Sequence, residues 1–311
     1  MTRISLRLAV ISLWLFINVG DLYAQRKNGF NLSDVAIPLD EIKSGGPPKD
    51  GIPALTKPKF TSADQAKYLK PKDKVIGVSI NGDHRAYPIK ILNYHEIIND
   101  DVGSTPIVIS YCPLCGSGLV FSAIFDSRIL NFGVSGLLYN SDVLMYDKQT
   151  NSLWSQLMMQ AISGKMIDQK LDFIESEHTT WKGWQAQHPD TKVLSDKTGH
   201  SRDYNRNPYE GYTRTPTLYF TVKHESDALP GKKQVLGIEV DGQYKAYSFS
   251  DLHKAGTLIE DSFNGDDFTI SFDSPNRSAK IIKSSQPIVY LTTYWFAWYT
   301  FHPETELYKA K

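Results

Sequence analysis

Two stretches of the chain repeat each other, and this repeat constrains the fold more than any other feature of the sequence. Residues 75–92 read VIGVSINGDHRAYPIKIL and residues 235–252 read VLGIEVDGQYKAYSFSDL, with six identical residues at a shift of 160 positions. Both stretches alternate apolar and polar residues around an Asn-Gly or Asp-Gly pair, which is typical of a β-hairpin. The sequence therefore predicts a β-hairpin unit that occurs twice.

A second repeat follows each hairpin in the same order. Residues 179–191, TTWKGWQAQHPDT, resemble residues 293–305, TYWFAWYTFHPET, at a shift of 114 positions. The first copy therefore carries about 46 extra residues, the difference between the two shifts. Since the pattern W-x-x-W-x-x-x-H-P occurs in both copies, we expect its Trp and His residues to have a structural role.

These repeats indicate a β-rich α+β fold with an internally duplicated hairpin and sheet unit and short helices. The many aromatic residues favour strands, and helices are expected at 61–69 and 93–100. The predicted organisation has four parts: a signal peptide at 1–24, a Pro/Gly-rich strap at 25–73, copy one with the cysteine-pair hairpin and an insertion at 74–232, and copy two, without cysteines, at 233–311.

The first residues have the pattern of a secretory signal. Arg3 and Arg7 accompany the apolar run LAVISLWLFINVG, and small or neutral residues lead up to Ala24. We expect cleavage after Ala24 and a periplasmic or extracellular protein with no membrane segment after cleavage. An uncleaved anchor is the alternative, but the run is shorter than a usual span. Acidic and basic residues balance, so nothing indicates a nucleic-acid partner.

Cys112 and Cys115 are the two cysteines of the chain, and they lie in the motif YCPLCGSG between two predicted strands. A Cys-Pro-x-Cys-Gly turn resembles the knuckle of rubredoxins and zinc ribbons, which supplies two thiolates to a metal ion. A second knuckle is missing here, so another ligand is required. His95 is the first candidate, with Asp142 and His84 behind it. Two thiolates and an imidazole suit Zn²⁺ or copper.

Two other roles for the cysteine pair stay open. Cys-Pro-x-Cys also resembles the active site of glutaredoxin, where a following helix lowers the pKa of the thiol. Here the strand-like GLVFSAIF follows instead. A redox role would make Cys112 and Cys115 catalytic, with His95 as a proton partner and an unknown redox partner or small molecule. A static disulfide is the third role, although so short a loop gains little entropy.

The runner-up function is a non-catalytic ligand-binding or interaction module. Residues 130–156 read as two strands beside the cysteine hairpin, and the loop HSRDYNRNPYEGY is dense in Arg, Asp and Tyr. The candidate pocket residues from these two segments are Tyr139, Asp142, Trp154 and Arg202. The chain has no P-loop, Rossmann fingerprint, HExxH or GxSxG motif, so the sequence indicates no enzyme class.

Several of these segments occur together and in order: GGPPKDGIPAL, NYHEIIND, ISYCPLCGSGLVF, FGVSGLLYNSDVLMYD, SLWSQ and SRDYNRNPY. In this the chain resembles a widespread family of exported bacterial and archaeal proteins, catalogued as a domain of unknown function and known by its YCPLCG signature. The match covers about 220 residues. The resemblance implies export and a single family-wide domain, and it carries no activity or binding residue over to this chain.

Overall fold

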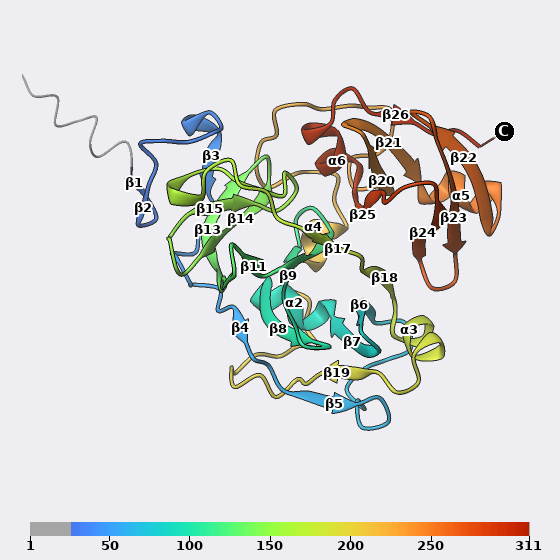
Figure 1. Cartoon of the computed structure of the whole chain (residues 1–311), viewed down its shortest axis with the longest axis horizontal. Coiled ribbons are helices and arrows are strands. Elements are labelled where there is room, and N and C mark those ends of the chain that lie inside the picture. The colour runs from blue at the N-terminus through green and yellow to red at the C-terminus, as the bar shows by residue number, and fades with distance from the viewer. Residues whose placement is uncertain (1–25, 311) are drawn as a thin grey trace, which may run out of the picture.

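Strands dominate the computed structural model, which describes residues 26–310. Five sheets stand around a ring in the arrangement of a five-bladed β-propeller (Figure 1). The predicted α+β class is therefore wrong. Each α-helix of the described residues has seven residues or fewer and connects strands, so the blades pack against one another instead of under a helical layer. The predicted signal peptide, 1–24, with its cleavage after Ala24, lies outside the described residues.

Three blades come from the first two thirds of the chain. Blade 1 contains, in spatial order, β18 (Glu177–Thr180), β6 (Lys74–Ile80), β7 (Asp83–Pro88), β19 (Lys192–Leu194) and β5 (Phe60–Ser62). Blade 2 contains β17 (Phe173–Ile174), β10 (Ser117–Ser122), β9 (Thr105–Cys112), β8 (Ile97–Val102) and β4 (Leu55–Thr56). Blade 3 contains β16 (Gln160–Ala161), β15 (Leu153–Ser155), β14 (Asp142–Asp147), β13 (Phe132–Tyr139) and β3 (Ile42–Ser44).

The last third of the chain forms the other two blades. Blade 4 contains β25 (Val289–Tyr294), β20 (Gln234–Val240), β21 (Gln243–Ser248) and β26 (Glu306–Leu307). Blade 5 contains β22 (Leu258–Phe263), β23 (Asp266–Asp273) and β24 (Ser278–Ser284). The ring runs through blades 3, 2, 1, 5 and 4: β8 contacts both β13 and β7, and β24 contacts both β18 and β25. The ring closes where Tyr139 of blade 3 packs on Phe301 beside blade 4.

Helices and two small hairpins complete the described chain. The helices are α2 (Ile89–His95), α3 (Trp181–Gln187), α4 (Glu210–Thr213), α5 (Phe249–Ala255) and α6 (Trp295–Phe301), with 3₁₀ turns η1 (Leu39–Glu41) and η2 (Gly164–Met166). The hairpins are β1 (Arg26–Lys27) with β2 (Phe30–Asn31), and β11 (Ile124–Phe125) with β12 (Arg128–Ile129).

Blades 1 and 4 are built alike. In each, an antiparallel hairpin has an antiparallel strand on one side and a parallel strand on the other, as β18-β6-β7-β19 and β25-β20-β21-β26. Asn81 and Asp241 open the hairpin turns with φ of 50° and 48°, and the glycines that follow also have positive φ, as the Asn-Gly and Asp-Gly pairs predict. The residue bounds assigned to the two copies stay a prediction.

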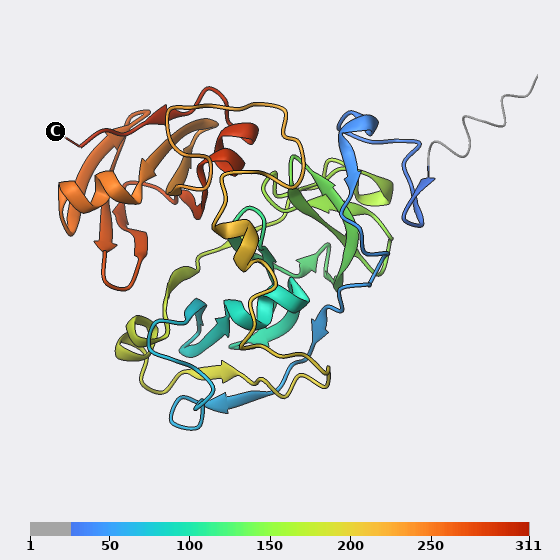
Figure 2. The same ribbon diagram turned by 180° about the vertical axis from the view of Figure 1, so that it is seen from behind.

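The segment before β6 runs along the outer side of three blades. It adds β3 to blade 3, β4 to blade 2 and β5 to blade 1, each as the outermost strand (Figure 2), where Pro and Gly are tolerated. The helix predicted at 61–69 is wrong, because β5 ends at Ser62 and turns follow. The helix predicted at 93–100 is wrong beyond His95, because β8 begins at Ile97.

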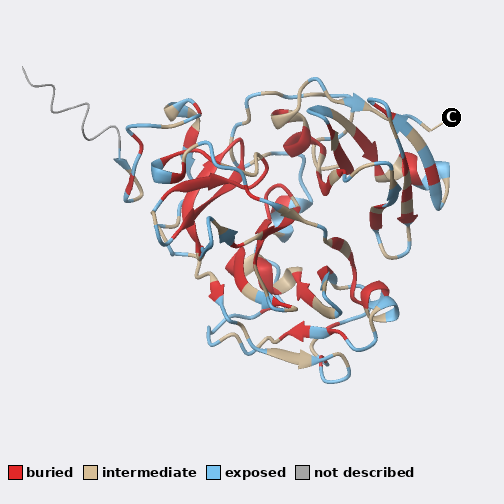
Figure 3. Ribbon diagram, in the orientation of Figure 1, coloured by how far each residue is buried: buried red, intermediate tan, exposed pale blue. Residues whose placement is uncertain are grey.

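The core lies where the blades meet. Buried residues follow the inner strands, whereas exposed residues gather in the loops and alternate with buried or half-buried ones on the outer strands (Figure 3). The largest core cluster joins β9 and β10 of blade 2, β13 to β15 of blade 3, and α6. Within residues 26–310, we find no helix with the length and hydropathy to cross a membrane.

Candidate metal centre

The two cysteines lie on the tight turn between β9 and β10. Cys112 is the last residue of β9 and the Cα partner of Ser117, the first residue of β10. Gly116, which precedes Ser117, has a φ of 61°, and a Cβ on it would lie 2.9 Å from the ring of Tyr294. Glycine therefore meets both a conformational and a steric requirement at this position.

Blade 4 holds this turn in place. The carbonyl of Cys115 accepts hydrogen bonds from the backbone N–H of Tyr294 and from the hydroxyl of Thr293, both at 2.9 Å. Both donors lie at the end of β25, where α6 begins. The position of the Cys115 thiol thus depends on a contact across the ring between residues far apart in sequence.

Asp142 reaches the cysteines from blade 3. It is the first residue of β14 and follows the turn residues Asn140 and Ser141, whose φ angles of 51° and 64° are those of a type I′ hairpin turn. The turn is held from outside, because the Ser141 hydroxyl donates to the carbonyl of Phe220 and the N–H of Lys223 donates to Asn140 Oδ1, both at 2.9 Å. This turn presents a carboxylate and a carbonyl to the thiols.

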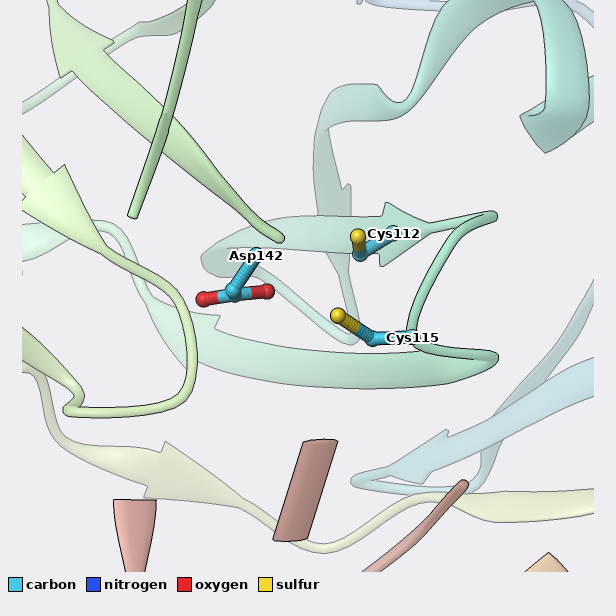
Figure 4. Close-up of side chains that lie close together, drawn as sticks. All are labelled: Cys112, Cys115 and Asp142. Carbon is cyan, nitrogen blue, oxygen red and sulfur yellow. The ribbon is translucent and has the colours of Figure 1, made fainter. Parts of the chain in front are cut away.

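The side chains of Cys112, Cys115 and Asp142 converge in one buried group. Their donor atoms all lie within 4.8 Å of one another, and the three residues are at most 1% exposed. Figure 4 shows both sulfur atoms turned toward the Asp142 carboxylate. The carbonyl of Ser141 accepts weak hydrogen bonds from the thiols of Cys112 and Cys115, at 3.6 and 3.4 Å. Both cysteines are free thiols in this arrangement.

Burial controls the charge of this group. Desolvation raises the pKa of Asp142 to about 7, although the N–H of Leu157 donates to its Oδ2 at 3.0 Å and opposes the shift. Burial, with Cys112 beside it, raises the pKa of the Cys115 thiol well above its ordinary value. A metal cation bound here would act in the opposite direction, because it favours the ionised thiol and carboxyl.

His95, the first-ranked ligand from the sequence, does not belong to this group. Its Nδ1 hydrogen-bonds with the carbonyl of Pro53 and its Nε2 with the hydroxyl of Tyr204, both at 2.7 Å. Burial lowers the pKa of the His95 imidazole to about 4. Both ring nitrogens are therefore occupied, and the neutral ring holds the strap to the segment around Tyr204.

His84, the other histidine named from the sequence, also lies apart from the cysteines. Its Nδ1 hydrogen-bonds with Ser79 at 2.8 Å, and its ring packs on His188 with 4.1 Å between centroids. Neither contact involves a residue of the donor group. His84 and His188 therefore stabilise the edge of blade 1.

The four residues of the predicted binding pocket are not brought together. Tyr139 is the Cα partner of Asp142, but its ring packs on Phe301 with 5.5 Å between centroids. Trp154 is fully buried and donates its indole N–H to Asp147 Oδ2 at 3.0 Å. Arg202 is exposed on a loop. Only Asp142 of these residues lies at the cysteines.

Gln156 is a site residue that sequence reasoning missed. Its Oε1 accepts from the Ser117 hydroxyl at 2.7 Å and its Nε2 donates to the Ser110 hydroxyl at 3.0 Å, and all three residues are fully buried. Gln156 thus ties together the two strands that carry the cysteine turn. The signal was present as the polar Ser-Gln pair that ends the buried strand SLWSQ.

The donor set fits a single thiophilic metal ion. Zinc binds sulfur at about 2.3 Å and oxygen at about 2.0–2.2 Å, so two ligand atoms of one tetrahedral ion are about 3.5–3.8 Å apart. The donor atoms here all lie within 4.8 Å of one another, so an ion would draw them together by up to about 1 Å. In addition, Asp142 Oδ1 is buried without a hydrogen-bond partner among the described residues apart from the neighbouring thiols, and a bound ion would satisfy it.

Comparison with known proteins places the chain in a family. No curated protein and no solved structure matches it significantly. One family description matches residues 49–288, which is most of the chain and includes both cysteines and Asp142. The chain therefore belongs to the family described as "Protein of unknown function (DUF3179)".

Proposed function

We propose that the protein binds one zinc or copper ion through Cys112, Cys115 and Asp142. The observation that carries the proposal is the convergence of three buried side chains from two blades, whose donor atoms all lie within 4.8 Å of one another. Thiolate ligands select zinc and copper(I) over magnesium or calcium. A buried carboxylate beside two thiolates would be unstable without a cation, because burial disfavours unpaired charge.

Three protein ligands leave a coordination position open on a tetrahedral ion. Zinc sites with three protein ligands are typically catalytic, whereas structural sites have four. Such an ion, when bound, acts as a Lewis acid and lowers the pKa of a bound water. The residues of the chain would hold the ion, exclude bulk water through burial, and keep Asp142 oriented through the N–H of Leu157.

Thiol–disulfide exchange is less well supported by this environment. Exchange requires a thiolate that a partner can reach. Both cysteines are at most 1% exposed, and burial raises the pKa of Cys115 away from the thiolate form. The non-catalytic module is also less well supported, because its four candidate residues do not line one pocket.

The test is a metal analysis of the protein purified from cells. We expect about one zinc or copper per chain in the native protein, and a loss of at least about 90% of it in Asp142→Asn and in Cys112→Ser, since each variant removes one of three ligands. His95→Gln is the matched control. It tests the ligand predicted from the sequence, and we expect it to keep its metal. Thermal unfolding identifies any variant that loses metal by losing its fold.

Two results would remove the proposal. One is native protein without stoichiometric metal whose cysteines form a disulfide that glutathione does not reduce, which indicates a static crosslink. The other is loss of metal in His95→Gln with retention in Asp142→Asn, which restores the ligand set first expected from the sequence.

We also propose that the site works outside the cytoplasm, on the basis of the signal peptide predicted at 1–24. Fractionation of the native cells with amino-terminal sequencing tests this. We expect the mature chain in the exported fraction and beginning at Gln25, and a cytoplasmic protein that begins with Met1 contradicts it.

A further inference from the structure

A cavity of about 170 Å³ lies directly beside Cys112. It opens between blades 2 and 3, under the strap and the segment that follows α4. Most of its wall is aliphatic or aromatic, and the residues that define its shape are Ile52, Leu114, Val134, Leu138, Val143 and Phe220. An apolar protein cavity of about 150 Å³ holds benzene, so this one has room for a single aromatic ring or a molecule of similar size.

One part of the cavity wall is polar. Glu96 lines it together with Cys112, and Tyr209, which also lines it, has its phenol group near the Glu96 carboxyl. Glu96 is only 7% exposed. The wall contains no Lys, Arg or His among the described residues. A ligand here can exchange a hydrogen bond with the carboxyl and the phenol, whereas an anion would lose its hydration and find no positive partner.

Glu96 ends α2 at a position where the second copy has glycine. Glu96 caps the C-terminus of α2 with φ 55° and ψ −39°, and its N–H donates to the carbonyl of Leu92. The equivalent cap of α5 is Gly256, whose N–H donates to Leu252 in the same way. Glycine is the usual residue where a helix ends with positive φ. A buried glutamate in a strained backbone conformation is typical of a functional position.

We propose that this cavity is the substrate pocket of the metal centre, and that it binds a small, neutral, largely apolar molecule with one hydroxyl or carbonyl group, which Glu96 and Tyr209 hold next to Cys112. The role as a substrate pocket rests on the proposed function. The binding of a small molecule in the cavity does not. Tyr219, which is 58% exposed, lies at the opening. Glu96 is a binding residue in this proposal, and Asp142 stays a metal ligand.

Phenol and toluene are suitable probes, because they have the same shape and number of non-hydrogen atoms and differ in one hydroxyl group. Benzoate is the charged control. Binding is measured by calorimetry to metal-loaded protein and to metal-free protein. We expect saturable phenol binding in both, about tenfold tighter than toluene because of the hydrogen bond to Glu96 and Tyr209, and no binding of benzoate.

Variants link the binding to this cavity. Ile52→Phe fills it from a half-buried position on the strap and should weaken phenol at least about tenfold. Ile282→Phe makes the same change at an exposed position of β24 and should have no effect. Glu96→Met keeps the size of the side chain and should bring the affinities for phenol and toluene close together. Thermal unfolding confirms that each variant folds.

The outcomes separate this inference from the metal proposal. Fully metal-loaded protein that binds no phenol overturns the pocket and leaves the metal site intact. Protein that binds phenol but never holds metal refutes the proposed function and the role as a substrate pocket. In cobalt-substituted protein, phenol should change the visible spectrum of the ion, and an unchanged spectrum at saturation overturns the link between pocket and metal.

Discussion

The turn from Cys112 to Ser117 in blade 2 and the turn from Asp273 to Ser278 in blade 5 have the same frame but different chemistry. Each joins two antiparallel strands through four residues between Cα partners. The last of the four, Gly116 or Arg277, has a φ of 61° or 54°. The turn forms equally well with and without cysteine, so its shape does not depend on the thiols.

Each of these two turns docks on the other half of the ring. The carbonyl of Cys115 accepts from Thr293 and Tyr294 at the start of α6. In the corresponding contact, the side-chain oxygen of Asn276 accepts from the hydroxyl of Thr180 at the start of α3, at 2.6 Å. The reciprocal contact is a reason for both copies to keep the turn.

The two turns differ in the partners of their side chains. In blade 5, Asp273 and Asn276 satisfy each other, with Asn276 Nδ2 donating to Asp273 Oδ2 at 2.8 Å. The positions of Asp273 and Asn276 correspond to those of Cys112 and Cys115, which face Asp142 instead. Asp142 comes from blade 3, and the second copy has no strand between β24 and β25 that could supply a counterpart. A structural turn thus becomes a candidate site where an extra blade places a carboxylate against it.

The largest expected effect tests whether the two copies share one scaffold. A Cβ on Gly77 would lie 2.2 Å from the ring of Trp184, and a Cβ on Gly237 would lie 2.3 Å from the ring of Trp298. Each ring is fixed by an indole hydrogen bond of 2.9 Å, so neither can move aside. We expect Gly77→Ala and Gly237→Ala each to lower the free energy of unfolding by about 3 kcal/mol, measured by denaturant titration.

Gly211→Ala is the control for this pair, because Gly211 lies in α4 and a Cβ there meets no atom within 4 Å. It should be neutral or slightly stabilising, since alanine favours helix. If one of the two buried glycines tolerates alanine and the other does not, the copies are not equivalent scaffolds.

A smaller expected effect is a pH dependence of the free energy of unfolding that comes from carboxyls of the first copy. Burial raises the pKa of Glu96 to about 8 and that of Asp142 to about 7. In the second copy the position of Glu96 is occupied by Gly256, and Asp142 has no counterpart. Because both folded pKa values exceed the unfolded ones, the folded chain keeps protons that the unfolded chain has released. These two carboxyls alone should therefore lower the free energy of unfolding of metal-free protein by about 2 kcal/mol between about pH 6.5 and pH 8.

The buried histidines offset part of this decline. Burial lowers the pKa of His95, His178 and His302 to about 4, whereas the unfolded histidines, with a pKa of about 6.5, are still half protonated at pH 6.5, so together they add about 1 kcal/mol of stability over the window and leave a net decline of about 1 kcal/mol. The double variant Glu96→Gln with Asp142→Asn should therefore gain about 1 kcal/mol over the window instead of losing it, in denaturant titrations at both pH values. A decline that persists in this variant assigns the proton uptake to other residues.

Local features of this chain were readable from the sequence, and long-range ones were not. The Asn81-Gly82 hairpin and the cysteine turn depend on neighbouring residues, whose φ requirements show in the sequence. The closure of five sheets into a ring depends on pairings such as β18 with β6, about a hundred residues apart. A hairpin pattern is the same in an open sheet and in a propeller, so the α+β class was wrong.

The same distinction between local and long-range features applies to the candidate site, of which the cysteine pair was predictable and the third ligand was not. Cys112 and Cys115 share one turn, so their convergence follows from local geometry. His95 was preferred as the third ligand because it is near in sequence, but α2 directs its ring to Pro53 and Tyr204. Asp142 reaches the thiols only because blade 3 packs beside blade 2, a tertiary contact that no local pattern encodes.

The smallest expected effect tests whether a cysteine pair is sufficient. The double variant Asp273→Cys with Asn276→Cys gives the turn of blade 5 the two thiols of blade 2 on the same backbone frame. The turn of blade 3 that carries Asp142 does not contact it, Asp273 is exposed to solvent and Asn276 is half-buried. We expect the metal content to stay at about one ion per chain after dialysis against a chelator, because two partly exposed thiolates bind more weakly than three buried donors. A second ion that survives the chelator would show that the turn alone makes the site, and that Asp142 and the extra blade are not what distinguishes the two copies.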